Sequence, residues 1–164
     1  AKVLDIYDRL SRYEGEPGAV VAYGSMYGNT EQMAERIARE LAEAGVRRIR
    51  VHNLSYADPS VVLRDVFRYD TLAVGSPTYN AELFPPVEQL LRRLEARCIP
   101  QRNFAFFGSF TWAAAAVRRM KEFSERMKWE PVCGPVEMKQ GYSPAMIDPC
   151  RSLAAAVAER VLRK

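Results

Sequence analysis

The sequence predicts an α/β three-layer sandwich, in which a parallel sheet lies between two layers of helices. Apolar runs typical of buried strands alternate five times with helical patterns along the 164 residues. The run at residues 71–75 contains no charged residue, as expected of a central parallel strand that is covered on both faces. A chain of this length is sufficient for one domain with its own core and right-handed crossovers.

The first thirteen residues have a helical pattern with apolar side chains on one face, at Val3, Tyr7 and Leu10. Glycines and a proline in residues 15–18 then interrupt this pattern. We therefore expect an N-terminal helix and linker over residues 1–17 and a single domain over residues 18–164.

Residues 19–23 are apolar and predict the first strand. An amphipathic helix is expected from about Glu31, with large apolar side chains at four-residue steps, at Met33, Ile37 and Leu41. Gly45 is expected to end this helix.

The second strand, at residues 49–53, is expected at a sheet edge because charged residues alternate through it. Asp58 and Pro59 then supply an N-cap and a proline at the first helical position, so we expect a helix to Arg68. The third strand follows at residues 71–75.

Another helix is expected from Pro85, with Leu94 and Cys98 on its inner side, so Cys98 is interpreted as a core residue. The remaining expected elements, in order, are a strand at 103–108, a helix at 112–127, a fifth strand over 129–133 and 136–138 interrupted at Gly134-Pro135, and a helix at 148–162.

Composition narrows the function classes. The formal charge is +4, and acidic and basic residues are mixed on the helix faces. Because mixed charges are typical of a solvated surface, we expect no nucleic-acid partner. No apolar run is long enough to span a bilayer, so no membrane partner is expected. Three widely spaced cysteines suit reduced thiols in a cytoplasmic protein. The single histidine, His52, is expected at the surface, and we predict neither a metal site nor a catalytic residue.

One cluster of basic residues, on the helix expected at 112–127, is a candidate surface for docking an acidic redox partner. Its members are Arg118, Arg119, Lys121, Arg126 and Lys128.

The segment between the first strand and its helix, residues 24–30, reads Gly-Ser-Met-Tyr-Gly-Asn-Thr and predicts a phosphate-binding loop. Backbone N–H groups and the hydroxyls of Ser25 and Thr30 can converge there on an anion at the positive end of the helix. The loop has neither the Lys-Ser/Thr of a triphosphate-binding loop nor the G-x-G-x-x-G of a dinucleotide site. We therefore expect a single phosphate group, held by uncharged donors.

Two further loops, residues 76–80 and 109–112, follow the third and fourth strands. The carboxyl ends of parallel strands meet at one edge of the sheet, where ligands of this class of fold bind. Both loops are rich in hydroxyl groups, and each carries a large aromatic residue, Tyr79 or Trp112. Together with the phosphate loop they predict a site for a flat, phosphorylated ring.

These motifs resemble the flavodoxin-like domain of flavodiiron proteins, also called A-type flavoproteins. The matching motifs are Ser-Met-Tyr-Gly-Asn-Thr from residue 25, Gly-Ser-Pro-Thr-Tyr-Asn from residue 75, Leu-Phe-Pro-Pro from residue 83 and Gly-Ser-Phe-Thr-Trp from residue 108. The similarity covers nearly the whole chain from about Val20, in the same order. It implies a flavodoxin-like fold with a five-stranded parallel sheet of order 2-1-3-4-5 and helices on both faces.

The resemblance implies non-covalent FMN, with its phosphate in the first loop and its ring between the other two. The cofactor-binding residues that it implies are Ser25, Met26, Tyr27, Gly28, Asn29, Thr30, Ser76, Pro77, Thr78, Tyr79, Asn80, Ser109, Phe110, Thr111 and Trp112.

The resemblance also implies a role in electron transfer. In the family, the flavin relays electrons from a rubredoxin-like or reductase donor to a diiron centre that reduces oxygen or nitric oxide. The iron ligands belong to a separate metallo-β-lactamase-like domain, so a diiron partner is expected in cis or in trans, with residues 1–13 in the region that joins the two domains. A homodimer is a further candidate assembly.

The sequence departs from the family pattern in two places. Thr111, Ala113 and Ala114 stand where the family commonly has two glycines and a serine, so the backbone approach to the flavin is expected to differ there. Ala81 stands where Gly or Asn is usual in a turn near the flavin N5, and alanine tolerates a positive φ poorly.

Two other functions are compatible with the same alternation of strands and helices. An NAD(P)H-dependent FMN quinone reductase would share the fold and the cofactor, and it stays open as the alternative. A phosphoacceptor receiver domain shares the five-fold alternation, but it requires an aspartate where the third strand ends in Gly75-Ser76.

Overall fold

The computed structural model describes residues 2–163, and the strands of its central sheet have the order β2-β1-β3-β5-β6. The parallel strands are β1 (Glu16–Tyr23), β2 (Ile49–Asn53), β3 (Tyr69–Tyr79), β5 (Asn103–Phe110) and β6 (Val136–Lys139). A short strand, β4 (Glu82–Leu83), pairs antiparallel with β3 outside this path. Counted along the chain without β4, the order is 2-1-3-4-5, which confirms the predicted fold.

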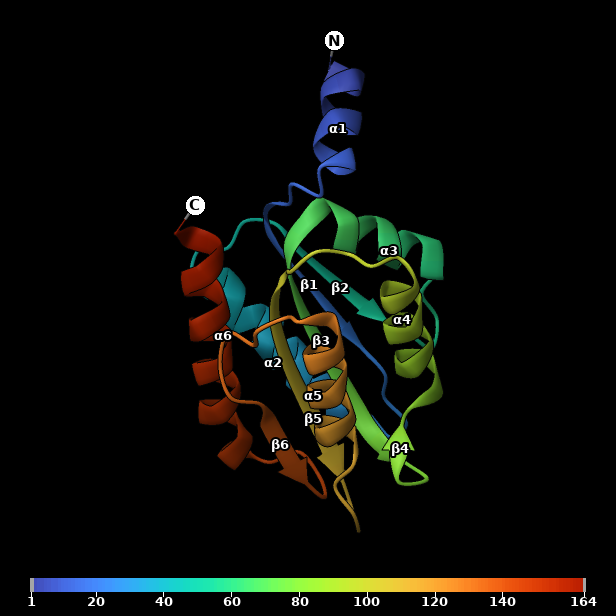
Figure 1. Ribbon diagram of the computed structural model, residues 1–164. Coiled ribbons are helices and arrows are strands. Elements are labelled where there is room, and N and C mark those ends of the chain that lie inside the picture. The colour runs from blue at the N-terminus through green and yellow to red at the C-terminus, as the bar shows by residue number, and fades with distance from the viewer. Residues whose placement is uncertain (1, 164) are drawn as a thin grey trace.

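Helices cover both faces of the sheet (Figure 1). One layer consists of α2 (Asn29–Glu43) and α6 (Ile147–Leu162), and the other of α3 (Pro59–Arg68), α4 (Pro85–Ala96) and α5 (Ala116–Met127). A short 3₁₀ helix, η1 (Pro144–Met146), precedes α6. The first helix, α1 (Lys2–Ser11), stands off the body beyond the edge opposite to the one where the strands end (Figure 1).

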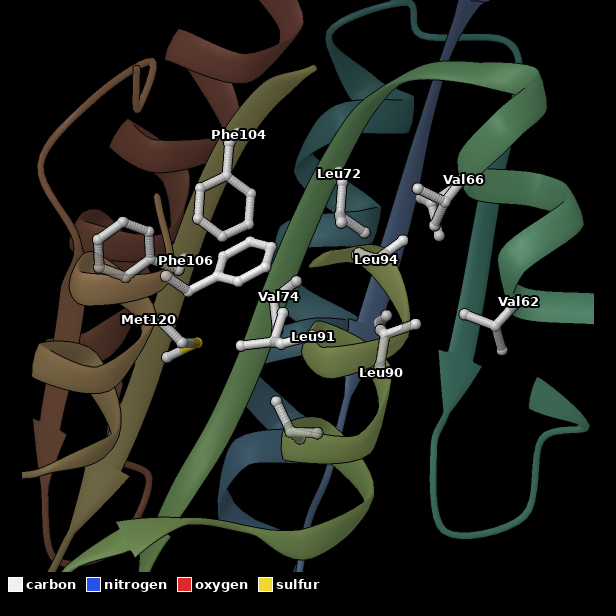
Figure 2. Packing of buried hydrophobic residues seen from close by; sticks show 14 of the residues in the cluster. Val62, Val66, Leu72, Val74, Leu90, Leu91, Leu94, Phe104, Phe106 and Met120 are labelled. Atoms are coloured by element: carbon white, nitrogen blue, oxygen red, sulfur yellow. The ribbon is translucent and has the colours of Figure 1, made fainter. Parts of the chain in front are cut away.

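Alternate strand residues fill two separate cores. Leu72 and Phe104 point toward the layer of α3, α4 and α5, as Figure 2 shows, whereas Ala73 and Phe107 point toward α2 and α6. This division follows from the two-residue period of a strand, and it explains why the central strands are apolar on both faces. Phe104 also packs edge-on against Trp129, with ring centroids 5.7 Å apart.

The predicted start of α3 is confirmed at atomic detail. Asp58 is the N-cap residue, and its Oδ1 accepts a hydrogen bond from the Ser60 backbone N–H at 2.7 Å. This hydrogen bond holds the pKa of the Asp58 carboxyl below its ordinary value. Pro59 occupies the first helical position, as expected.

Two expectations about single side chains are wrong. Cys98 is exposed, because α4 ends at Ala96 and the chain turns at Cys98 with a φ of 48°, which takes the thiol off the inner helical face. His52 is mostly buried although it lies on an edge strand, because α3 covers that face of the strand. Its Nε2 lies 2.9 Å from Oδ2 of the buried Asp65.

Among the residues that the structure describes, no helix has both the length and the apolar character needed to cross a bilayer.

Close packing between neighbouring strands predicts a strong effect at Gly75, which pairs with Phe107. A Cβ at position 75 would lie 2.2 Å from Cε2 of the fully buried Phe107 ring. Gly75→Ala is therefore expected to lower the free energy of unfolding by about 2–3 kcal/mol in urea denaturation.

Gly134→Ala is the matched control, because a Cβ there meets open space. Its expected change is within about 0.5 kcal/mol. Equal effects of the two substitutions would contradict this account of the sheet's packing.

Candidate functional site

A pocket opens at the edge of the sheet where the strands end. Its lining residues come from the last residues of β3 and β5 and from the segments that follow β1, β3, β5 and β6: Ser25, Met26, Tyr27, Asn29, Thr30, Pro77, Thr78, Tyr79, Asn80, Ser109, Phe110, Thr111 and Gln140. These segments meet because the parallel register aligns Tyr23 with Gly75 and Gly75 with Phe107. Among the described residues that line this pocket, no side chain carries a charge.

The loop after β1 presents backbone donors to the pocket. Gly28 has a φ of 84°, and its N–H donates a hydrogen bond to Ser25 Oγ at 3.1 Å. This bond closes the loop onto the start of α2. The first backbone hydrogen bond of α2 runs from the Gln32 N–H to the Gly28 carbonyl. The N–H groups of residues 29–31 precede that bond and point out of the positive end of the helix, where an anion is favoured.

A buried hydrogen bond joins this loop to the end of β5. Thr30 Oγ1 and Ser109 Oγ lie 2.9 Å apart, and both side chains are almost completely buried. Because one hydroxyl uses its hydrogen in this bond, the other keeps a hydrogen that it can donate to a ligand.

The C-terminal end of β3 is fixed by two hydroxyl groups. Ser76 is fully buried, and its Oγ donates to the Pro77 carbonyl and accepts from the Phe84 N–H, so it supports this end of the strand from below. Thr78 Oγ1 accepts hydrogen bonds from the backbone N–H groups of Ala115 and Ala116, at 3.2 and 3.1 Å.

The hydrogen bonds to Thr78 explain why α5 begins later in the chain than predicted. The expectation of a helix from Trp112 is wrong, since α5 begins at Ala116. The first N–H groups of a helix need partners, and Thr78 supplies one from the end of β3. Residues 111–115 therefore cross to that cap without helical structure.

The residues Asn80 and Ala81 form a two-residue hairpin turn between β3 and β4. Both have positive φ angles, 48° and 58°, as a type I′ turn requires. Ala81 thus adopts the positive φ that alanine tolerates poorly, at a cost of about 1–2 kcal/mol.

The aromatic residues near the pocket differ in their placement. Tyr79 packs edge-on against Phe84 at 6.1 Å, and Tyr27 is exposed at the pocket mouth. Trp112 is 94% exposed and lines an adjoining hollow, together with Asn80. Of the predicted cofactor-binding residues, those that do not line the pocket are Gly28, Ser76 and Trp112.

Gln140 lines the pocket but is missing from the prediction. It lies in the loop after β6, where its N–H donates to the Phe110 carbonyl at 2.8 Å. The next loop residues are held by Asn29, whose Oδ1 accepts from the Tyr142 N–H at 3.2 Å. The rule that ligands bind at the carboxyl ends of strands applies equally to the fifth strand, and it would have pointed to this loop.

Glu31 in the first turn of α2 carries a carboxylate, and this carboxylate binds Tyr23. Tyr23 Oη donates to Glu31 Oε1 at 2.7 Å, and burial raises the pKa of this phenol, so it stays protonated and keeps the bond. Within residues 2–163, no three His, Cys, Asp or Glu side chains lie close enough together to hold a metal ion.

The model of the Flavodoxin family matches residues 21–152. The chain belongs to the flavodoxin family. The curated relatives of this flavodoxin domain include a nitric oxide reductase of Moorella thermoacetica, 28% identical over 134 residues, which are 82% of this chain and 33% of the relative. The chain thus spans about a third of the length of the curated relatives that it matches.

Solved structures extend this comparison. The rubredoxin oxygen:oxidoreductase of Desulfovibrio gigas superposes with a TM-score of 0.91 at 22% identity, over 96% of this chain and 39% of that one. A flavodoxin from the domain Archaea superposes with a TM-score of 0.76 at 25% identity, over 88% of this chain and 98% of that one.

FMN is the cofactor of the flavodoxin domain, and the chemistry of the donor set fits it. The loop after β1 offers backbone N–H groups, a helix terminus and a hydroxyl to a phosphate. The C-terminal ends of β3 and β5, with the residues that follow them, offer peptide groups and aromatic surface to a ring. When bound, FMN supplies one- and two-electron transfer.

The role of Thr30 can be measured with two flavins. A hydrogen bond to a charged phosphate is worth about 1.5–3 kcal/mol, so Thr30→Val is expected to raise the FMN dissociation constant about tenfold or more. Riboflavin lacks the phosphate, and its affinity should not change. Equal losses for the two flavins, measured by fluorescence quenching, would contradict a phosphate site at Thr30.

The hairpin turn gives a second prediction. Glycine adopts a positive φ without strain, so Ala81→Gly is expected to raise the free energy of unfolding by about 1 kcal/mol in urea denaturation. Ala113→Gly, in the loop before α5 and outside the left-handed region, should instead lower it by about 0.5 kcal/mol. Destabilisation by both changes would argue against the strained turn.

Proposed function

We propose that this chain is an FMN-binding electron-transfer domain that receives electrons from a rubredoxin-like or reductase donor and passes them to a diiron centre outside this chain. That centre would reduce oxygen or nitric oxide. The observation that carries the proposal is a pocket of uncharged donors at the edge of a flavodoxin sheet, in a chain that matches a third of a relative named nitric oxide reductase.

The known activities in the names of two relatives support this choice of partners. One of them is a nitric oxide reductase, and the solved structure with a TM-score of 0.91 is a rubredoxin oxygen:oxidoreductase. Both are much longer than this chain, which leaves room in them for a second domain.

In the proposed complex, residues 25–30 hold the phosphate of FMN through backbone N–H groups and the Thr30 hydroxyl. The ring lies between residues 77–80 and the segment 109–112, where Tyr79 and Trp112 supply aromatic faces. Because Trp112 stands on a loop and is 94% exposed, its proposed contact requires this loop to fold over the ring.

Electrons would enter and leave at the same edge of the sheet. Tyr27, Tyr56 and Trp112 are exposed there, on the segments that follow β1, β2 and β5. A partner that covers this edge would come close to the ring without crossing the protein core. The basic cluster on α5 contributes less charge than its composition suggests, because Arg119 is paired with Glu82 and Arg126 with Glu95.

We also propose that residues 1–13 join this domain to its diiron partner. α1 has no buried residue, and its apolar side chains Val3, Leu4 and Tyr7 are all more than half exposed. An isolated helix of ten residues is marginally stable in water, so this face is expected to pack against another domain. The match to the flavodoxin family begins only at residue 21.

The electron donor decides between this function and the alternative. The FMN-loaded chain should be bleached rapidly by reduced rubredoxin in an anaerobic stopped-flow experiment, and only slowly by NADH or NADPH alone. Rapid bleaching by a nicotinamide nucleotide would contradict the proposal and favour the NAD(P)H-dependent quinone reductase.

The proposed role of α1 predicts that it is dispensable for cofactor binding. A variant without residues 1–11 keeps the stacking of Tyr13 on Phe67, and its FMN dissociation constant is expected to stay within about twofold of the wild-type value. A large loss of FMN affinity would mean that α1 belongs to the flavin-binding unit.

A further inference from the structure

The turn of Asn80 and Ala81 forms one wall of the pocket. The short hairpin that contains this turn is too small to hold it in place by itself. β4 contributes only two residue pairs, Thr78 with Leu83 and Tyr79 with Glu82. A hairpin of this size is marginally stable by itself, and this one carries two non-glycine residues with positive φ. Contacts with neighbouring elements must therefore fix the turn.

Arg119 of α5 makes such a contact with Glu82, the residue directly after the turn. Its Nε donates to Glu82 Oε2 at 2.6 Å and its Nη2 donates to Glu82 Oε1, so the guanidinium binds both carboxylate oxygens. Its Nη1 donates to Glu122 Oε2 at 3.0 Å, which holds the guanidinium on the helix. The bonds from Arg119 keep the pKa of Glu82 below its ordinary value, so the carboxylate is charged at neutral pH.

The same helix also holds the strand that precedes the turn. Thr78 accepts hydrogen bonds from Ala115 and Ala116 at the start of α5. Thr78 and Glu82 flank the turn, so α5 fixes both of its sides. Because α5 follows the loop after β5, this arrangement sets the separation between two walls of the pocket.

We propose that Arg119 and Glu82 are positioning residues for the flavin site, which hold the Asn80–Ala81 turn at the distance from the loop after β5 that the FMN ring needs. Neither residue lines the pocket. The inference rests on the proposed function because it requires FMN to occupy this pocket, and it adds two residues that sequence motifs do not mark.

The test compares Arg119→Gln, Glu82→Gln and the double variant by the dissociation constant of FMN, measured by fluorescence quenching. Either single change breaks the same solvent-exposed contact, so each is expected to raise the constant by about three- to fivefold, and the double variant no further than the singles. If the two residues acted only through their charges on the FMN phosphate, the results would differ. Arg119→Gln would weaken binding, Glu82→Gln would strengthen it, and the double variant would resemble the wild type.

Arg126→Gln is the matched control. Arg126 lies on the same helix, and its Nε donates to Glu95 Oε1 of α4 at 2.6 Å, away from the turn. Its FMN dissociation constant should stay within about twofold of the wild-type value. The visible circular dichroism of bound FMN, which reports the surroundings of the ring, should change in Arg119→Gln and Glu82→Gln and stay unchanged in Arg126→Gln.

Unchanged constants in both single variants, or changes of opposite sign, would overturn the proposal. If Arg119→Gln does not fold, Glu82→Gln decides alone, because positioning and charge predict opposite changes for it. A wild-type chain that fails to bind FMN would instead overturn the proposed function.

Discussion

The buried hydrogen bond between Thr30 and Ser109 joins segments that lie 79 residues apart in the sequence. It can form only because β1, β3 and β5 lie side by side in parallel register, with Tyr23 at the end of β1 opposite Gly75 of β3. A slip of one residue would exchange the two faces of a strand and bury the wrong side chains, so the apolar cores keep this register. The sheet therefore places the hydroxyl groups of the site before any ligand binds.

The pocket combines this rigid base with a strained wall. Asn80 and Ala81 both occupy the left-handed region, and the conformation persists because Ser76, Thr78 and Glu82 bind groups on other segments around the turn. The uncharged donors and the helix terminus on one side, and the held turn on the other, are in place before a ligand enters, whereas the loop that carries Trp112 still has to move. Such preorganisation lowers the entropic cost of binding.

The sequence was sufficient for the parts of the structure that depend on local patterns. The alternation of apolar runs and helical stripes predicted the sandwich, Asp58-Pro59 predicted the start of α3, and the motif resemblance supplied the strand order. Contacts between residues that are distant in the sequence could not be predicted from local patterns. The cap that Thr78 provides for α5 spans 38 residues, and the Arg119–Glu82 pair spans 37, so neither the true start of α5 nor the support of the turn has a local signal. Cys98 was misplaced because the helical pattern continues past Ala96, where the helix ends.

The proposed function requires the start of α2 to bind the phosphate of FMN through backbone N–H groups. An NMR titration of the ¹⁵N-labelled chain measures these groups directly. On addition of FMN, the amide protons of Asn29, Thr30 and Glu31 should move downfield, and riboflavin should leave them nearly unchanged while it shifts the amides of residues 78–80. Equal shifts of the residue 29–31 amides with the two flavins, or none with FMN, would contradict the account.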